Sequence, residues 1–134
     1  MGRVKKAFLD TLNHTLNPLT LRAARAGRGP FSLVRHVGRK SGRTFETPLI
    51  LAQVPGGFVA ELTYGDQVNW YRNIVKGGGV IVHRRHEYPI TAVEPLDRAQ
   101  GLVAFGGFRA VVLRLLRRHE FRMLRTEVGS PVAV

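Results

Sequence analysis

The chain has 134 residues and carries 21 lysines and arginines against 9 acidic residues, a formal net charge of +12. It contains no cysteine, which excludes disulfide scaffolds, cysteine-based metal sites and thiol catalysis. Its length fits a single domain spanning residues 1–134, and a hydrophobic content of 44% predicts a globular fold. The charge implies an anionic partner: nucleic acid, an anionic membrane surface, or an acidic cofactor or substrate.

The first part of the chain, residues 1–28, is predicted to be a basic helical segment. Apolar residues recur near the helical period from Val4 to Leu16, and Pro18 ends the pattern. We expect the apolar face to cover the remaining fold, although a basic amphipathic helix could also lie on an anionic membrane. No apolar run approaches the roughly 20 residues that cross a bilayer, and no signal-peptide core is visible. We therefore expect a cytoplasmic protein and leave association with a membrane surface open.

The middle of the chain, residues 31–94, is predicted to form the β core. The apolar runs predict strands over residues 31–37, 48–54 and 58–64, the last two joined as a hairpin by Pro55-Gly56-Gly57. A helix is predicted from an Asp66 N-cap to Lys76, followed by a second hairpin of residues 80–83 and 88–93.

Three polar side chains in these strands need an interpretation. Glu61 is unusual in the middle of a strand; we expect it to be exposed, with a contact to an arginine as the alternative. His83 and His86 flank the second hairpin turn and suggest a metal site, but no third ligand is evident. A polar turn is the favoured interpretation.

The C-terminal part, residues 98–128, is predicted to be helical. Its apolar stripe, which we expect to belong to the core, consists of Phe108, Val111, Val112, Leu115 and Leu116. Arginines surround the stripe, so contact with lipid through this basic terminus stays as a second hypothesis. The basic segments lack the interleaved aromatics of nucleic-acid modules, so no nucleic-acid partner is expected.

A basic loop separates the first two predicted strands and has the sequence Gly38-Arg39-Lys40-Ser41-Gly42-Arg43. It places three cations and a hydroxyl within six residues. Its two glycines permit a sharp turn and close approach of a ligand. Such a loop can form a concave anion site at the mouth of a β structure. A solvated basic turn explains the same residues equally well on chemical grounds alone.

This loop, followed by Thr47-Pro48-Leu49, resembles the signature of the deazaflavin-dependent nitroreductase family, typical of actinobacteria. Residues 58–65 resemble the central strand of that family, and residues 69–74 resemble its Trp-Tyr helix. The likeness covers about residues 33–94 and is closest to a divergent short branch. It implies an α+β, mainly β fold: a split β-barrel (FMN-binding-like roll) of about six strands with flanking N- and C-terminal helices. It also implies pairing into a homodimer.

The resemblance further implies a cofactor site for F420, with FMN as the less favoured cofactor. The implied cofactor-binding residues are Gly38, Arg39, Lys40, Ser41, Gly42, Arg43, Thr47, Pro48, Leu49, Thr63, Tyr64, Gly65, Trp70 and Asn73. The residues of the basic loop would hold the phosphate and the acidic tail of the cofactor. Thr47, Pro48 and Leu49 would lie along its linker and the edge of its ring. Residues 63–65 would offer main-chain groups to the ring. Trp70 and Asn73 would pack against the far side of the pocket.

Side chains suited to catalysis are scarce. None of the three serines lies in a nucleophile-elbow setting, and no carboxylate pair is placed for acid–base work. We therefore expect no catalytic side chain and no metal, with the hydride carried by the cofactor. The leading hypothesis is an F420-dependent oxidoreductase acting on an unsaturated, quinone-type or nitro-type small molecule. The alternatives are a non-catalytic binder of a fatty acid or other anionic lipid at a membrane surface, and a basic nucleic-acid-binding protein.

Overall fold

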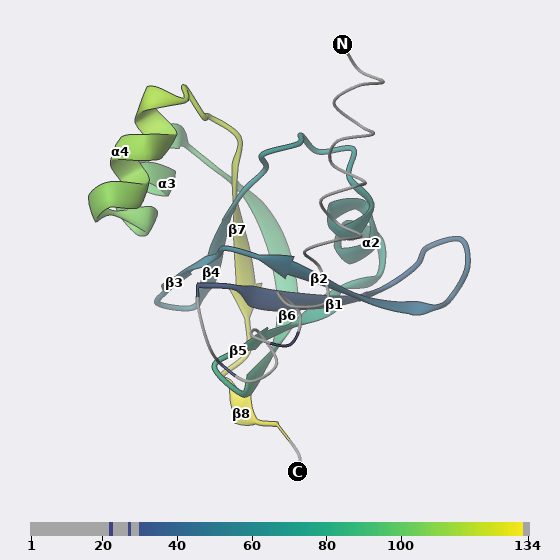
Figure 1. Ribbon diagram of the computed structural model, residues 1–134. Coiled ribbons are helices and arrows are strands. Elements are labelled where there is room, and N and C mark those ends of the chain that lie inside the picture. The colour runs from purple at the N-terminus through teal and green to yellow at the C-terminus, as the bar shows by residue number, and fades with distance from the viewer. Residues whose placement is uncertain (1–21, 23–26, 28–29, 133–134) are drawn as a thin grey trace.

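The strands of the computed structural model belong to one antiparallel sheet (Figure 1). The structure describes Arg22, Gly27 and residues 30–132, so the predicted N-terminal helix lies outside the described residues. The described strands are β1 Ser32–Val37, β2 Thr44–Leu49, β3 Ala52–Val54, β4 Gly57–Glu61, β5 Gly79–His83, β6 His86–Leu96, β7 Phe121–Thr126 and β8 Ser130–Pro131. The described helices are α2 Asn69–Gly77, α3 Arg98–Phe105 and α4 Gly107–Leu115.

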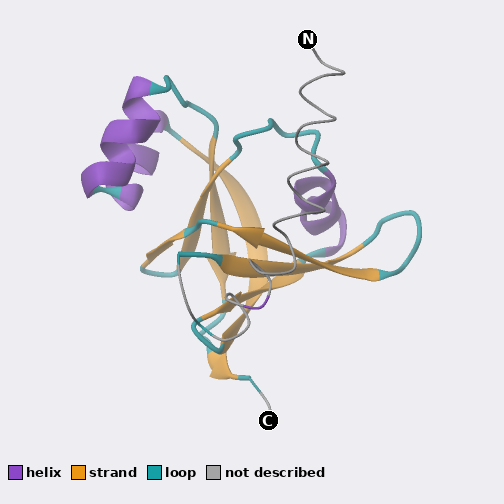
Figure 2. Ribbon diagram, viewed as in Figure 1, coloured by secondary structure: helices purple, strands orange, loops and turns teal. Residues whose placement is uncertain are grey.

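The long strand β6 connects the two halves of the sheet. The strand order is β2-β1-β5-β6-β7-β4-β3, and β8 pairs with the start of β6. The first residues of β6 pair with β5, and its residues from Ile90 onward pair with β7, with a bulge between Ile90 and Ala92. This register shift lets the two halves run in different directions, as Figure 2 shows. The sheet is not closed, because β2 and β3 are its two end strands.

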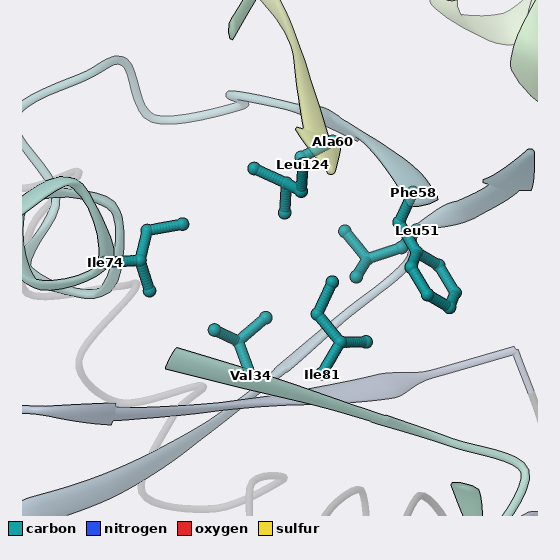
Figure 3. Packing of buried hydrophobic residues seen from close by; sticks show 7 residues of the cluster. All are labelled: Val34, Leu51, Phe58, Ala60, Ile74, Ile81 and Leu124. Carbon is teal, nitrogen blue, oxygen red and sulfur yellow. The ribbon is translucent and has the colours of Figure 1, made fainter. Parts of the chain in front are cut away.

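The main core lies between these halves. Its buried side chains come from β1, β4, β5, β7, the segment before β3, and α2, and they point toward one another in Figure 3. They are Val34, Leu51, Phe58, Ala60, Ile74, Ile81 and Leu124. Ile74 is the contribution of α2, so burial of this side chain holds the helix against the sheet beside β1.

A second core lies on the other face of β4 and β7. Val59 packs there with Leu102 of α3 and with Phe121 and Met123 of β7. Both faces of β4 are thus covered, since Phe58 and Ala60 belong to the main core and Val59 to the second. The pair of helices α3 and α4 stands at this end of the molecule (Figure 1).

The mainly β, α+β fold expected from the sequence is confirmed, with two differences in detail. The described residues form eight strands rather than about six. The predicted C-terminal helical region 98–128 is helical only to Leu115, because β7 occupies Phe121–Thr126 between β6 and β4. Both faces of β7 bury apolar side chains, which removes the alternation that identifies a strand with one exposed face.

The prediction of a single strand over residues 48–54 is wrong. Its first part ends β2, which pairs with β1, whereas Ala52–Val54 forms β3 and pairs with β4. The chain changes partner at Ile50 and Leu51. The hairpin around Pro55-Gly56 is therefore confirmed only for β3 and β4, and β4 ends at Glu61 rather than at residue 64.

Two further predictions can be compared with the structure. Helix α2 starts at Asn69, with Val68 rather than Asp66 at the N-cap and no side-chain capping bond, so the Asp66 prediction is wrong. The second hairpin is confirmed as β5 and β6, and Arg84 and Arg85 form its turn with positive φ angles of 49° and 65°. In the part of the chain that the structure describes, no helix combines the length and apolar character needed to cross a membrane.

Candidate functional site: a basic cleft that joins an apolar cleft

The loop between β1 and β2 is a tight turn that extends beyond the strands (Figure 2). The Gly38 N–H donates to the Arg43 carbonyl at 2.8 Å, and the Gly42 N–H donates to the Gly38 carbonyl at 2.9 Å. Gly42 has a φ of +73°, which other residues rarely adopt. The Ser41 hydroxyl accepts a hydrogen bond from the Arg43 N–H at 3.2 Å. The sequence therefore closes the turn through its own main chain and leaves Lys40 and Ser41 exposed.

A buried hydrogen-bond network ties this loop to α2. The Asn73 Oδ1 atom accepts from the Arg39 main-chain N–H at 3.1 Å and from Arg39 Nη1 at 2.9 Å. The Asn73 Nδ2 group lies 2.9 Å from His36 Nδ1, and His36 Nε2 lies 2.9 Å from the Thr47 hydroxyl. The network thus links β1, the loop, β2 and α2.

The network defines the protonation state of His36. Because Asn73 Oδ1 accepts two hydrogen bonds from Arg39, its Nδ2 group must be the donor toward His36 Nδ1. The His36 proton then lies on Nε2 and is donated to Thr47. Burial lowers the pKa of His36 below its ordinary value of 6.5, which favours the same neutral ring.

The loop, β2 and α2 enclose a cleft of about 670 Å³, which we call the basic cleft. Its lining combines cationic, polar and aromatic residues: His36, Gly38, Arg39, Lys40, Ser41, Phe45, Glu46, Thr47, Pro48, Leu49, Tyr64, Val68, Asn69, Trp70 and Asn73. The volume is within the range of roughly 300–1,000 Å³ that is typical of small-molecule sites.

A second cleft of about 470 Å³, which we call the apolar cleft, lies between the sheet and the helices α3 and α4. Its lining is mostly aliphatic and aromatic: Phe31, Pro48, Leu49, Ile50, Leu51, Ala60, Glu61, Thr63, Tyr64, Phe105, Phe108, Arg109, Val112 and Leu113. The two clefts share Pro48, Leu49 and Tyr64. A ligand long enough to pass these three residues would contact both clefts.

Most of the predicted cofactor-binding residues line the basic cleft. Those that do so are Gly38, Arg39, Lys40, Ser41, Thr47, Pro48, Leu49, Tyr64, Trp70 and Asn73. Thr63 lines only the apolar cleft, and Gly42, Arg43 and Gly65 line neither. The Arg43 guanidinium instead lies over the Phe45 ring, 5.6 Å from its centre.

Arg118 stabilises the turn at residues 63–65 through hydrogen bonds to its main chain. Its Nη2 group donates to the carbonyls of Leu62 and Thr63 at 2.9 and 2.7 Å and forms an ion pair with Glu61 at 3.2 Å. The Glu61 side chain is only 7% exposed, so the expectation that it faces solvent is wrong and the contact with an arginine is correct. The Gly65 N–H donates to Leu62, and a Cβ at Gly65 would meet no atom within 4 Å.

Few groups in either cleft are placed to transfer a proton. Both ring nitrogens of His36 are hydrogen-bonded within the protein. The carboxylates of Glu46 and Glu61 form ion pairs with Arg35 and Arg118. Tyr64, which is 55% exposed at the junction of the clefts, has an accessible hydroxyl-bearing side chain. The residues of the site are therefore better suited to binding and orienting a reactive group than to supplying one.

The two histidines of the β5–β6 hairpin have separate partners. His83 lies opposite His86 in the register, and its Nδ1 lies 2.7 Å from the Ser32 hydroxyl. The His86 Nδ1 lies 3.1 Å from the Arg84 carbonyl. Within the described ranges, no group of three histidine, aspartate or glutamate side chains is placed to hold a metal ion.

Sequence reasoning did not assign His36, Asn69 or Phe45 to the site. His36 is the informative case, because its position two residues after Val34 puts it on the buried face of β1. Asn69 receives a hydrogen bond from Arg39 Nη1 at 3.3 Å, across 30 residues of sequence. No local pattern predicts that pairing.

No protein-family model and no curated protein matches this chain. Several solved structures match this chain, and one of them aligns with it at 15% sequence identity and a TM-score of 0.49. The alignment covers 84% of this chain and 82% of the other. A likeness this distant has no bearing on the function of the site.

Proposed function

We propose that the protein is an F420-dependent oxidoreductase that transfers a hydride to an unsaturated, quinone-type or nitro-type small molecule. The observation that carries the proposal is the junction of a basic cleft and an apolar cleft at Pro48, Leu49 and Tyr64. A deazaflavin cofactor has an anionic tail and a planar ring, and its reducible partner is a separate apolar molecule. Two joined clefts of opposite character fit that pair of ligands.

The donor groups of the basic cleft fit the anionic part of such a cofactor. The Arg39 Nη1 group is engaged by Asn69 and Asn73, which orients the guanidinium and leaves its remaining N–H groups for a phosphate or carboxylate. Lys40 adds a second cation and Ser41 a hydroxyl.

The far end of the basic cleft fits a planar ring. Trp70 packs edge-on against Tyr71 with ring centres 5.7 Å apart and forms an aromatic wall. Tyr64 and Leu49 border the same space and also reach the apolar cleft. When bound there, the deazaflavin would supply the hydride, and the protein would bind it, orient it and exclude water.

The test is a titration of the purified protein with F420, with FMN as the control ligand. Trp70 is the only tryptophan in the sequence, so quenching of its fluorescence reports on the basic cleft. We expect saturable quenching by F420 at micromolar or lower concentration, and none by FMN over the same range. Lys40→Ala should weaken binding at least about tenfold, through loss of a charge-assisted contact. Lys76→Ala, which removes a lysine from the last turn of α2, should not.

A second candidate is a non-catalytic binder of a fatty acid or other anionic lipid. The observation in its favour is Arg109, which joins the otherwise apolar side chains of α4 along the apolar cleft. In this case a fluorescent fatty acid would bind with Arg109-dependent affinity, whereas F420 would neither bind nor compete. Mass spectrometry of an organic extract of the purified protein would then detect a bound lipid.

A further inference from the structure

We propose that helix α4 docks on an anionic lipid surface through a stripe of exposed apolar side chains. The docking stripe consists of Phe108, Val111 and Leu115, which recur three and four residues apart and so share one helix face. Their exposed fractions are 82%, 52% and 76%. The stripe predicted from the sequence also included Val112 and Leu116, and the expectation that it belongs to the core is wrong for all of its residues except the half-buried Val112.

The packing of α4 explains why the stripe is exposed. The helix has no fully buried residue, and it meets the second core only through the partly buried Leu113. Val112 and Leu113 border the apolar cleft on the inner side. The fold thus uses the inner side of α4 and leaves its two largest outer side chains in solvent. Adjacent exposed apolar residues of this size mark an interaction surface.

The charges beside the docking stripe indicate an anionic surface. Arg109 and Arg114 are exposed on either side of it, and Arg117 follows the helix. Residues 107–118 contain four arginines and no acidic residue. An apolar face bordered by arginines is the pattern of a helix lying in a membrane interface, with the cations at the lipid headgroups.

The shape and symmetry of this surface favour a bilayer over a second copy of the chain. The pair α3 and α4 stands at one end of the molecule (Figure 1). A two-fold pairing through the docking stripe would bring the arginines of one α4 close to the same arginines of the other. A lipid surface presents opposite charge to all of them and needs no complementary groove.

Docking would also place the apolar cleft at the lipid surface. Phe108 belongs to the docking stripe and lines the apolar cleft, so the stripe and the cleft are continuous. An apolar ligand could then pass from the lipid phase into the cleft without crossing water. The docking itself requires no assumption about the cofactor.

The experiment uses vesicles and single cysteines, since the chain has none of its own. Leu115→Cys is labelled with an environment-sensitive fluorophore, and Val75→Cys in α2, exposed by 58%, is the matched control. We expect a blue shift at position 115 with vesicles that contain phosphatidylglycerol. We expect none with phosphatidylcholine alone and none at position 75. Absence of a shift with any vesicle would overturn the proposal and leave the stripe to a protein partner.

A second measurement separates the docking stripe from the other basic parts of the chain. Phe108→Ser with Leu115→Ser should lower partitioning into anionic vesicles at least about tenfold. Val75→Ser with Val128→Ser, which removes two other exposed valines, should change it less than about twofold. Equal partitioning of both variants would contradict docking through α4. A label shift that grows with protein concentration in the absence of vesicles would assign the stripe to a second copy.

Discussion

The side-chain amide of Asn73 connects three parts of the candidate site. It is 3% exposed, accepts two hydrogen bonds from Arg39, and donates one to His36. The basic loop therefore depends on a neutral residue of α2 for its position. Removing this amide would leave the buried His36 and the partly buried N–H groups of Arg39 without their partner, which costs more than the loss of an exposed hydrogen bond.

Asn73→Ala should lower the free energy of unfolding by about 2 kcal/mol and weaken any ligand of the basic cleft. Asn69→Ala is the matched control, because it changes the same residue type in α2 but removes only the exposed 3.3 Å bond to Arg39. That variant should lose less than about 0.5 kcal/mol. Urea denaturation measures both, and equal losses would show that the network does not position the loop.

Stability should depend on pH through His36 and His83. Burial lowers the pKa of both below 6.5, and Arg84 lowers that of His83 further. The unfolded chain therefore binds more protons than the folded chain once the pH falls below about 6.5. The free energy of unfolding should be constant above that pH and fall below it. His36→Gln should reduce this slope between pH 7 and 5 in thermal denaturation, and an unchanged slope would contradict a buried, neutral His36.

At the scale of the elements, sequence patterns predicted the parts of the fold that depend on local chemistry. Strand β1 and the β5–β6 hairpin follow from apolar runs and the turn at Arg84-Arg85. Strand β7 was not predicted from the sequence, because Phe121 and Leu124 are three residues apart, a spacing that also fits a helix. Only its position between β6 and β4, buried on both faces, makes the segment a strand.

The candidate site was predictable to a similar extent. The glycines of residues 38–43 predict the turn that the structure contains, whereas the anion site suggested by the cations stays a prediction. The role of Arg39 as a brace to α2, and the burial of Glu61 against Arg118, depend on contacts across 34 and 57 residues of sequence. A single sequence carries no local signal for such contacts.

The close contact between α3 and β7 leads to a prediction about the stability of glycine variants. A Cβ at Gly101 would overlap the Phe121 ring, whereas a Cβ at Gly77, the last residue of α2, would meet no atom within 4 Å. Gly101→Ala should therefore cost about 1–3 kcal/mol through overpacking. Gly77→Ala should gain up to about 1 kcal/mol, because alanine restricts the unfolded chain and favours the helix. Thermal denaturation compares the two, and a stabilised Gly101→Ala protein would contradict the close approach of α3 to β7.

For the whole molecule, the net charge of +12 makes ionic strength a discriminating variable. A cofactor held partly by ring packing and main-chain contacts should lose less than about tenfold in affinity between 50 and 500 mM salt. A nucleic acid held by six to ten phosphate contacts would lose roughly a thousandfold or more over a comparable range. Titrations with F420 and with an oligonucleotide at several salt concentrations measure how steeply each affinity falls as the salt concentration rises. A steep slope for a tightly bound oligonucleotide, with no F420 binding, would favour the nucleic-acid hypothesis.

The most direct test of the proposed cofactor site is a map of amide chemical-shift changes on addition of F420 to the ¹⁵N-labelled protein. We expect saturable changes in the loop of residues 38–43, at Tyr64 and Gly65, and in the first turns of α2, including Asn73. We expect only small changes in α4 and β8, which lie outside the basic cleft. Changes confined to the arginine-rich C-terminal helices, or no saturable change at all, would contradict an F420 site in the basic cleft.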